Sequence, residues 1–169
     1  PKAIGHAATI RKSALSLLDL ISDVLDLSRI EAGGTSLRPK VFDLSELLHD
    51  TAAMFAPVAE RQGLAFTLTL ADDLPSRVEA DPVRLRQVLV NLLGNAMKFT
   101  AAGEVRLVAN GEAGTATQAH IRFAVIDTGI GIPTLAQAVL FTPFMHGDTG
   151  EEAQARRGTG LGLAITAEL

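Results

Sequence analysis

The chain has 169 residues, 47% of them hydrophobic, with a formal net charge of −4 at pH 7 and no cysteine. This length and apolar content suit one folded domain with a small addition, and they exclude a globally disordered chain. The acidic balance argues against a nucleic-acid partner, the lack of cysteine excludes disulfides and thiolate zinc sites, and no apolar run reaches the ~20 residues of a membrane-spanning helix.

The first predicted element is an amphipathic helix that ends at Gly33 and Gly34, because glycine commonly follows the last helical turn. Its apolar residues recur at alternating four- and three-residue steps, which is typical of a helical bundle or coiled coil. They are Ile10, Ala14, Leu17, Ile21 and Val24, with Leu18 and Leu25 widening the stripe. A single amphipathic helix cannot bury its own stripe, so we interpret residues 1–34 as a dimer-forming element.

The rest of the chain, residues 35–169, is predicted to be an α+β domain that begins with a strand at 41–44. Ser45 is predicted to cap the next helix, because a serine side chain can accept a backbone hydrogen bond at that position. This helix is predicted to run to about residue 62, where Gly63 ends it.

Two strands and a second long helix come next. Alternation of apolar and polar residues predicts strands at 66–70 and 77–80. Asp81 and Pro82 then open a helix that runs to about Phe99, with a carboxylate cap and a proline in the first turn.

The remaining sequence predicts a strand pair, a loop and a final helix. The strands are predicted at 104–109 and 120–126, with residues 110–117 as their connection. Weak periodicity at 132–157 predicts a long mobile loop with one short helix, and a helix is predicted at 163–169.

Polar residues on the helix that ends near Phe99 share one stripe beside its apolar face. Asn91, Asn95 and Lys98 are spaced i, i+4 and i+7, which at about 100° per residue confines them to that stripe. The predicted apolar face consists of Leu85, Val88, Leu89, Leu92, Leu93, Ala96 and Phe99. Amide oxygens suit Mg²⁺ and an ammonium suits phosphate, but for this stripe alone an ordinary polar helix face is the stronger interpretation.

A second candidate motif follows the apolar strand that ends at Ile126. Asp127, Gly129 and Gly131 form an Asp-x-Gly-x-Gly pattern. A carboxylate at a strand end can accept a hydrogen bond from an exocyclic amine such as that of adenine, and glycines permit close backbone approach. An ordinary strand-to-turn exit is the alternative interpretation.

A glycine-rich run precedes the final helix and consists of Gly158, Thr159, Gly160, Leu161 and Gly162. Such a run presents backbone N–H groups to phosphate oxygens at a helix N-terminus. It lacks the Lys-Ser/Thr of the GxxxxGK[ST] phosphate loop, and no strand feeds it as in a dinucleotide fingerprint.

The motifs in this order resemble the ATP-binding domain of sensor histidine kinases, within the superfamily that includes gyrase, heat-shock chaperone ATPases and mismatch-repair ATPases. The segments that carry the resemblance are NLLGNAMKFT, DTGIGI, FTPF and GTGLGLAI, which are similar to the family's asparagine, first glycine, phenylalanine and second glycine boxes. LLDLISDVLDLSRIEAGG and FDLSELL resemble the end of its dimerisation hairpin and the start of its catalytic domain. The resemblance implies a two-layer α/β sandwich, with a mixed sheet covered by helices on one face.

The resemblance also implies a role for each candidate residue. Asn95 is implied as the Mg²⁺ ligand, with Asn91 beside the phosphates, Lys98 on a phosphate and Asp127 on the adenine amino group. The other implied nucleotide-site residues are Gly129, Gly131, Phe141, Gly158, Thr159, Gly160, Leu161 and Gly162.

The loop at 132–157 is implied to be a mobile lid over ATP. Phe141 and Phe144 are implied to anchor it, which for aromatic residues nearly coincides with simple packing. Arg156 and Arg157 either reach the γ-phosphate or belong to a solvated charged loop.

Asn91 stands where the hydrolysing members of the superfamily place a glutamate general base, and an amide cannot take a proton from water. The implied activity is therefore a protein-histidine kinase, which passes the γ-phosphoryl of Mg-ATP to a histidine of the dimerisation domain and onward to a response-regulator aspartate. The implied partners are ATP, Mg²⁺, a second copy of the chain and a receiver domain. The alternatives are a nucleotide-binding pseudokinase or dimeric scaffold, and a hydrolysing ATPase.

The family's acceptor box, His-Glu/Asp-x-x-Thr-Pro, does not occur in these residues. His6 is followed by Ala7, with no carboxylate to assist it, and is interpreted as an ordinary surface or interface histidine. We expect the acceptor upstream of Pro1, the last strands of the sheet to be missing after Leu169, and the chain to be a cytoplasmic part of a larger sensor without membrane contact of its own.

Overall fold

The computed structural model describes residues 14, 17, 18, 21, 22, 24, 25, 28, 37–112, 114, 115, 118–145 and 159–169. The chain divides into two units, one made of residues 37–133 and the other of residues 1–36 with 134–169. The described residues between 14 and 28 are all helical, which confirms the predicted first helix at those positions. None of the described helices is long and apolar enough to cross a membrane.

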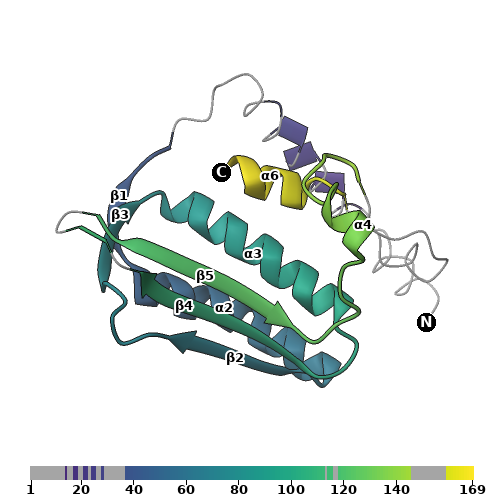
Figure 1. Ribbon diagram of the computed structural model, residues 1–169, viewed down its shortest axis with the longest axis horizontal. Helices are drawn as coiled ribbons and strands as arrows, with labels where there is room; N and C mark the ends of the chain where they lie inside the picture. The colour runs from purple at the N-terminus through teal and green to yellow at the C-terminus, as the bar shows by residue number, and fades with distance from the viewer. Residues whose placement is uncertain are drawn as a thin grey trace. The chain divides into compact units, whose positions relative to one another are not determined.

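The larger unit is a two-layer α/β sandwich. Its elements are β1 (Lys40–Asp43), α2 (Leu44–Gln62), β2 (Ala65–Leu70), β3 (Arg77–Ala80), α3 (Pro82–Phe99), β4 (Glu104–Glu112) and β5 (His120–Asp127). β2 pairs parallel with β4, β4 pairs antiparallel with β5, and β1 and β3 form a separate antiparallel pair. Both long helices cover the same face of the three-stranded sheet (Figure 1). The predicted α+β fold is confirmed.

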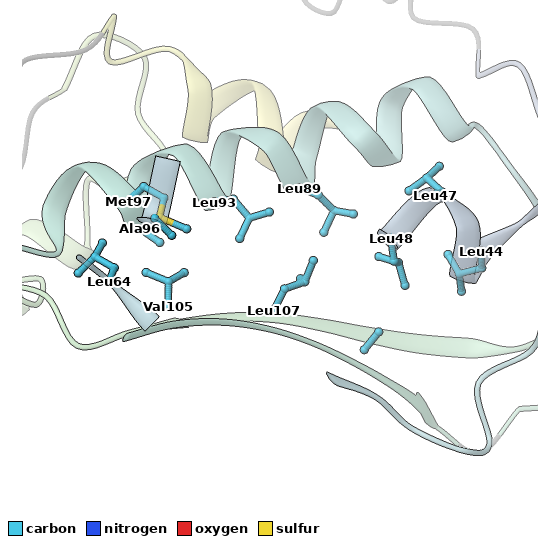
Figure 2. Close-up of a cluster of buried hydrophobic side chains, with 12 residues drawn as sticks. Leu44, Leu47, Leu48, Leu64, Leu89, Leu93, Ala96, Met97, Val105 and Leu107 are labelled. Atoms are coloured by element: carbon cyan, nitrogen blue, oxygen red, sulfur yellow. The ribbon is translucent and has the colours of Figure 1, made fainter. Parts of the chain in front are cut away.

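The core lies between this sheet and the two helices. Alternate residues of β4, namely Val105, Leu107 and Ala109, are fully buried, because successive side chains of a strand point to opposite faces. Leu89 and Leu93 of α3 face Val105 and Leu107 across the core, as Figure 2 shows. The remaining fully buried leucines of the cluster are Leu44 and Leu48 of α2.

The predicted start of α2 was wrong in one detail. Asp43, not Ser45, is the N-cap, and its Oδ1 accepts a hydrogen bond from the backbone N–H of Glu46 at 2.9 Å. Ser45 lies inside the first turn, where its hydroxyl is 3.3 Å from Nδ1 of His49. The predicted end is confirmed, because Gly63 adopts a left-handed conformation with φ 69° after Gln62.

The helix α3 matches its predicted boundaries at both ends. Asp81 accepts hydrogen bonds from the backbone N–H groups of Val83 and Arg84, and Pro82 occupies the first helical position. Its buried residues include Met97, which the predicted apolar face omitted, whereas four predicted members are only half-buried, namely Leu85, Val88, Leu92 and Phe99. This shift follows from packing, because α3 contacts α2 as well as β4 and β5, so its buried stripe is set by the neighbouring helix and the sheet together.

The strand β4 is longer than predicted and runs through Asn110 and Gly111 to Glu112. The predicted connection at 110–117 therefore starts too early, because its first three residues belong to β4. In the smaller unit, the short helix predicted within the loop is α4 (Thr134–Gln137), and the final helix is α6 (Gly162–Glu168).

Candidate functional site

The polar stripe of α3 lies at the border between the core and the surface. Asn91, Asn95 and Lys98 are all half-buried, in contrast to Leu93 and Ala96 beside them, which are buried. This placement confirms the predicted spacing of the stripe relative to the core face.

Lys98 has an unusual electrostatic environment. Burial lowers the pKa of its ammonium, because the charged form loses hydration there. Its Nζ lies 4.7 Å from the centroid of the Phe99 ring, within the range of a cation–π contact. A partly dehydrated cation attracts an anion more strongly than a fully solvated one, so Lys98 is suited to binding phosphate.

Asp127 is the last residue of β5, and its carboxylate is held on one side only. Its Oδ1 accepts a hydrogen bond from the backbone N–H of Gly129 at 2.8 Å and is 3.4 Å from the donor Oγ1 of Thr100. Within the described part of the chain, Oδ2 has no hydrogen-bond partner. The side chain is exposed, so Oδ2 is free to accept a hydrogen bond from a ligand.

The turn that follows Asp127 lies against the C-terminal end of α3. The backbone N–H of Ile130 donates to the carbonyl of Phe99 at 3.3 Å. A Cβ atom at Gly129 would lie 2.5 Å from the same carbonyl oxygen, so only glycine fits there. Gly131 has open space around it but adopts φ 70°, a conformation that glycine accepts without strain.

Thr128 and Thr100 fix this turn, and sequence reasoning missed both. Thr128 Oγ1 accepts from the backbone N–H of Glu104 at 2.9 Å, and its own N–H donates to the Glu104 carbonyl at 3.1 Å. Gly103, at φ 109°, leaves room for the Thr128 hydroxyl. Each threonine stands next to a predicted motif residue in sequence, but the contacts it makes join segments more than twenty residues apart.

The smaller unit holds the other candidate segments. The backbone N–H of Phe144 donates to the carbonyl of Gly160 at 3.0 Å, which joins the FTPF segment to the glycine-rich run. The side chains of Phe141 and Phe144 are 54% and 60% exposed, so their predicted anchoring role rests on no described packing. Thr159 Oγ1 accepts from the N–H of Leu161 at 3.2 Å, and Gly162 begins α6.

Gly158, Arg156 and Arg157 lie outside the described residues. No group of three or more His, Cys, Asp or Glu side chains comes together in the part of the chain that the structure describes. Binding of Mg²⁺ does not require such a group, because that ion keeps several waters and uses few protein ligands.

Comparison with known proteins gives one family match and close relatives. The family described as histidine kinase-, DNA gyrase B-, and HSP90-like ATPase matches residues 80–169. The chain is 40% identical over all of its 169 residues to the signal transduction histidine-protein kinase BarA of Escherichia coli K12, and equally to the sensor protein GacS of Pseudomonas syringae pv. syringae. It spans 18% of the length of each of these relatives.

Among solved structures, the chain is similar to full-length ShkA, which was crystallised in complex with AMPPNP. The TM-score is 0.82 at 35% sequence identity, and the similarity covers 99% of this chain and 33% of that one.

Proposed function

Because this chain belongs to the histidine kinase-, DNA gyrase B-, and HSP90-like ATPase family, we propose that it is the ATP-binding catalytic part of a sensor histidine kinase. Its activity is transfer of the ATP γ-phosphoryl group to a histidine of a dimerisation helix, for relay to an aspartate of a response regulator. The names of its relatives and the AMPPNP complex of ShkA support this proposal.

The observation that carries the proposal is the attachment of the Asp127–Gly131 turn to the end of α3. The hydrogen bond from Ile130 to Phe99 attaches this turn to α3, the helix that bears Asn95 and Lys98. The turn begins at the carboxylate that accepts a hydrogen bond from adenine in this proposal. Both parts belong to the same unit, residues 37–133. A nucleotide whose base contacts Asp127 can therefore direct its phosphates along a helix of matching chemistry.

Each residue has a distinct part in the proposed site. The amide oxygen of Asn95 is a ligand to Mg²⁺, the ammonium of Lys98 neutralises phosphate charge, and Asp127 accepts a hydrogen bond from the adenine amino group. Gly129 and Gly131 leave space for the base. From the sequence motifs alone, we also propose nucleotide contacts for Phe141, Gly158, Thr159, Gly160, Leu161 and Gly162.

Phosphoryl transfer needs positioning and charge neutralisation more than covalent chemistry from the protein. A histidine nitrogen attacks the γ-phosphorus, the P–N bond forms, the bond to the β,γ-bridging oxygen breaks, and ADP leaves. Asn91 is beside the phosphates in this proposal, and its amide cannot deprotonate water. The site is therefore suited to holding ATP for another nucleophile and not to hydrolysing it.

The helical segment of residues 1–34 is proposed to form the dimer. Its described apolar residues Leu17, Leu18, Ile21, Val24 and Leu25 are all exposed in the single chain. An exposed apolar stripe on a helix needs a partner, and a second copy of the same helix supplies a matching one. Mg²⁺, a response-regulator receiver domain as partner and a cytoplasmic location complete the proposal.

A phosphotransfer assay tests it. The chain is incubated with Mg²⁺, [γ-³²P]ATP and a polypeptide carrying a dimerisation helix with its acceptor histidine, and both phosphohistidine and free phosphate are measured. We expect acid-labile, alkali-stable label on the acceptor that depends on Asn95, with little phosphate released without it. Steady phosphate release without label on the acceptor would identify a hydrolysing ATPase, and a folded chain that binds no nucleotide would identify a scaffold.

A further inference from the structure

Thr100 is a buried polar residue at the point where α3 ends. Thr100 is only 4% exposed. Its backbone N–H closes the last helical turn by donating to the carbonyl of Ala96 at 3.1 Å. A buried hydroxyl needs a hydrogen-bond partner, because leaving it unsatisfied is costly. In the described part of the chain, the only partner of Thr100 Oγ1 is Oδ1 of Asp127.

This contact determines how the Asp127 carboxylate is oriented. The torsion that rotates a carboxylate is broad and soft, so a single hydrogen bond to Gly129 leaves the group free to turn about that bond. The second donor, Thr100, approaches the same oxygen from α3. Two donors on Oδ1 fix the plane of the carboxylate and leave Oδ2 as the acceptor that faces a ligand.

We propose that Thr100 is a positioning residue that makes the site select purines with a 6-amino group, an inference that rests on the proposed function. A fixed carboxylate oxygen accepts a hydrogen bond from a 6-amino group, whereas it gains nothing from an unsubstituted ring and opposes a 6-carbonyl oxygen. A carboxylate that turns freely loses part of this discrimination. Thr100 therefore acts on base selectivity through Asp127 without touching the base.

The distance from Thr100 Oγ1 to Asp127 Oδ1 is 3.4 Å, which is longer than the usual O–H···O separation. Hydrogen bonds in ligand-free sites are often long and shorten in the complex. When a bound base contacts Oδ2, Thr100 and Gly129 both hydrogen-bond to Oδ1 and keep the carboxylate in one orientation. The contribution of Thr100 is thus expected in ligand binding more than in the stability of the free protein.

The test compares two nucleotides that differ only at the 6-position, ATP and purine riboside triphosphate, which lacks the amino group. Thr100→Val keeps the branched shape and removes the hydroxyl, and Thr100→Ser keeps the hydroxyl. Dissociation constants for both nucleotides are measured with Mg²⁺ for the wild type and for each variant, and thermal unfolding monitors the fold.

In Thr100→Val, we expect the ratio of affinities for ATP and purine riboside triphosphate to fall about tenfold, as the loss of one hydrogen bond to a charged group predicts. Its affinity for purine riboside triphosphate stays near the wild-type value, and Thr100→Ser retains the preference. Equal weakening of both nucleotides, or an unchanged preference in Thr100→Val, overturns the inference. Thr100→Ala, which adds no bulk, supplies the same comparison if the valine variant does not fold.

The two hypotheses fail differently. A folded wild type that does not bind ATP, or binds both nucleotides equally, contradicts the proposed function of Asp127. A wild type that prefers ATP, together with a Thr100→Val variant that prefers it equally, leaves the proposed function intact and removes only the role of Thr100.

Discussion

Gly129 touches Phe99 through backbone atoms alone, since a Cβ atom at Gly129 would lie 2.5 Å from the Phe99 carbonyl oxygen and 2.7 Å from Oδ1 of Asp127. The turn that carries the candidate base-binding carboxylate is thereby fitted to the end of the helix that carries the candidate phosphate-binding stripe. A side chain at this one position would separate the two.

We therefore expect Gly129→Ala to displace the turn, to weaken ATP binding at least tenfold, and to destabilise the fold by about 1–3 kcal/mol, as overpacking typically does. Gly94→Ala is the matched control, because Gly94 lies in α3 and a Cβ there meets nothing within 4 Å. That substitution should stabilise the fold by about 1 kcal/mol through helix propensity. Chemical denaturation of both variants tests the contrast, and equal effects would contradict it.

Asp43 and Ser45 offer a second matched pair at the start of α2. Asp43→Ala removes the acceptor for the N–H of Glu46 and should lower the free energy of unfolding by about 1 kcal/mol. Ser45→Ala removes only the surface contact with His49 and should change it by less than about 0.5 kcal/mol. A larger loss for Ser45→Ala in denaturant titrations would show that the serine is the functional cap.

The carboxylate of Asp81 connects the start of α3 to the segment that precedes β1, and this connection is predicted to be sensitive to acid. Hydrogen bonds from the backbone N–H groups of Arg38, Arg84 and Val83 lower the pKa of its carboxyl below the usual 3.8. A lowered folded-state pKa means that the stabilisation is present above the unfolded-state pKa and is lost as the pH falls through the folded-state value. The stability difference between wild type and Asp81→Ala should be constant near neutral pH and shrink below about pH 4. A difference that persists undiminished in acid would argue against the carboxylate as its source.

The environment of Lys98 predicts that nucleotide affinity falls at alkaline pH. Burial lowers its pKa in the free protein, and bound phosphate favours the ammonium and raises the pKa again. Binding therefore takes up a proton between the two pKa values, so that affinity falls as the pH rises through the free-state value. Calorimetry in buffers of different ionisation heat measures this uptake. Lys98→Arg, which stays charged, should bind without it, and proton uptake that survives in this variant would assign the titration to another group.

The sequence predicted the elements best where local signals were strong and agreed. The strand at 77–80 and the helix from Pro82 to Phe99 were placed correctly, because alternation, an aspartate cap and an early proline all mark the same boundary. Asp43 and Ser45 are both good capping residues two positions apart, and only the folded backbone decides between them.

Other features depend on contacts between distant segments and were out of reach. Asn110 and Gly111 have the composition of a turn, but β4 continues through them, and Gly111 there lies close to Asp73. In the candidate site, Asp127, Asn95 and Lys98 were identified from motifs. Thr100 was not, because its contact with Asp127 spans 27 residues and leaves no local pattern.

The most direct test of the central claim is Mg²⁺-dependent binding of a fluorescent ATP analogue to wild type, Asp127→Asn and Asn95→Ala. The backbone N–H of Gly129 donates to Oδ1 of Asp127. In Asp127→Asn, the side-chain oxygen therefore stays on that side, and the NH₂ group faces the adenine amine. We predict saturable binding that needs Mg²⁺, weakened about tenfold or more by Asp127→Asn, with the Mg²⁺ dependence reduced in Asn95→Ala. Binding that neither substitution changes, or no binding by a folded wild type, would contradict the account.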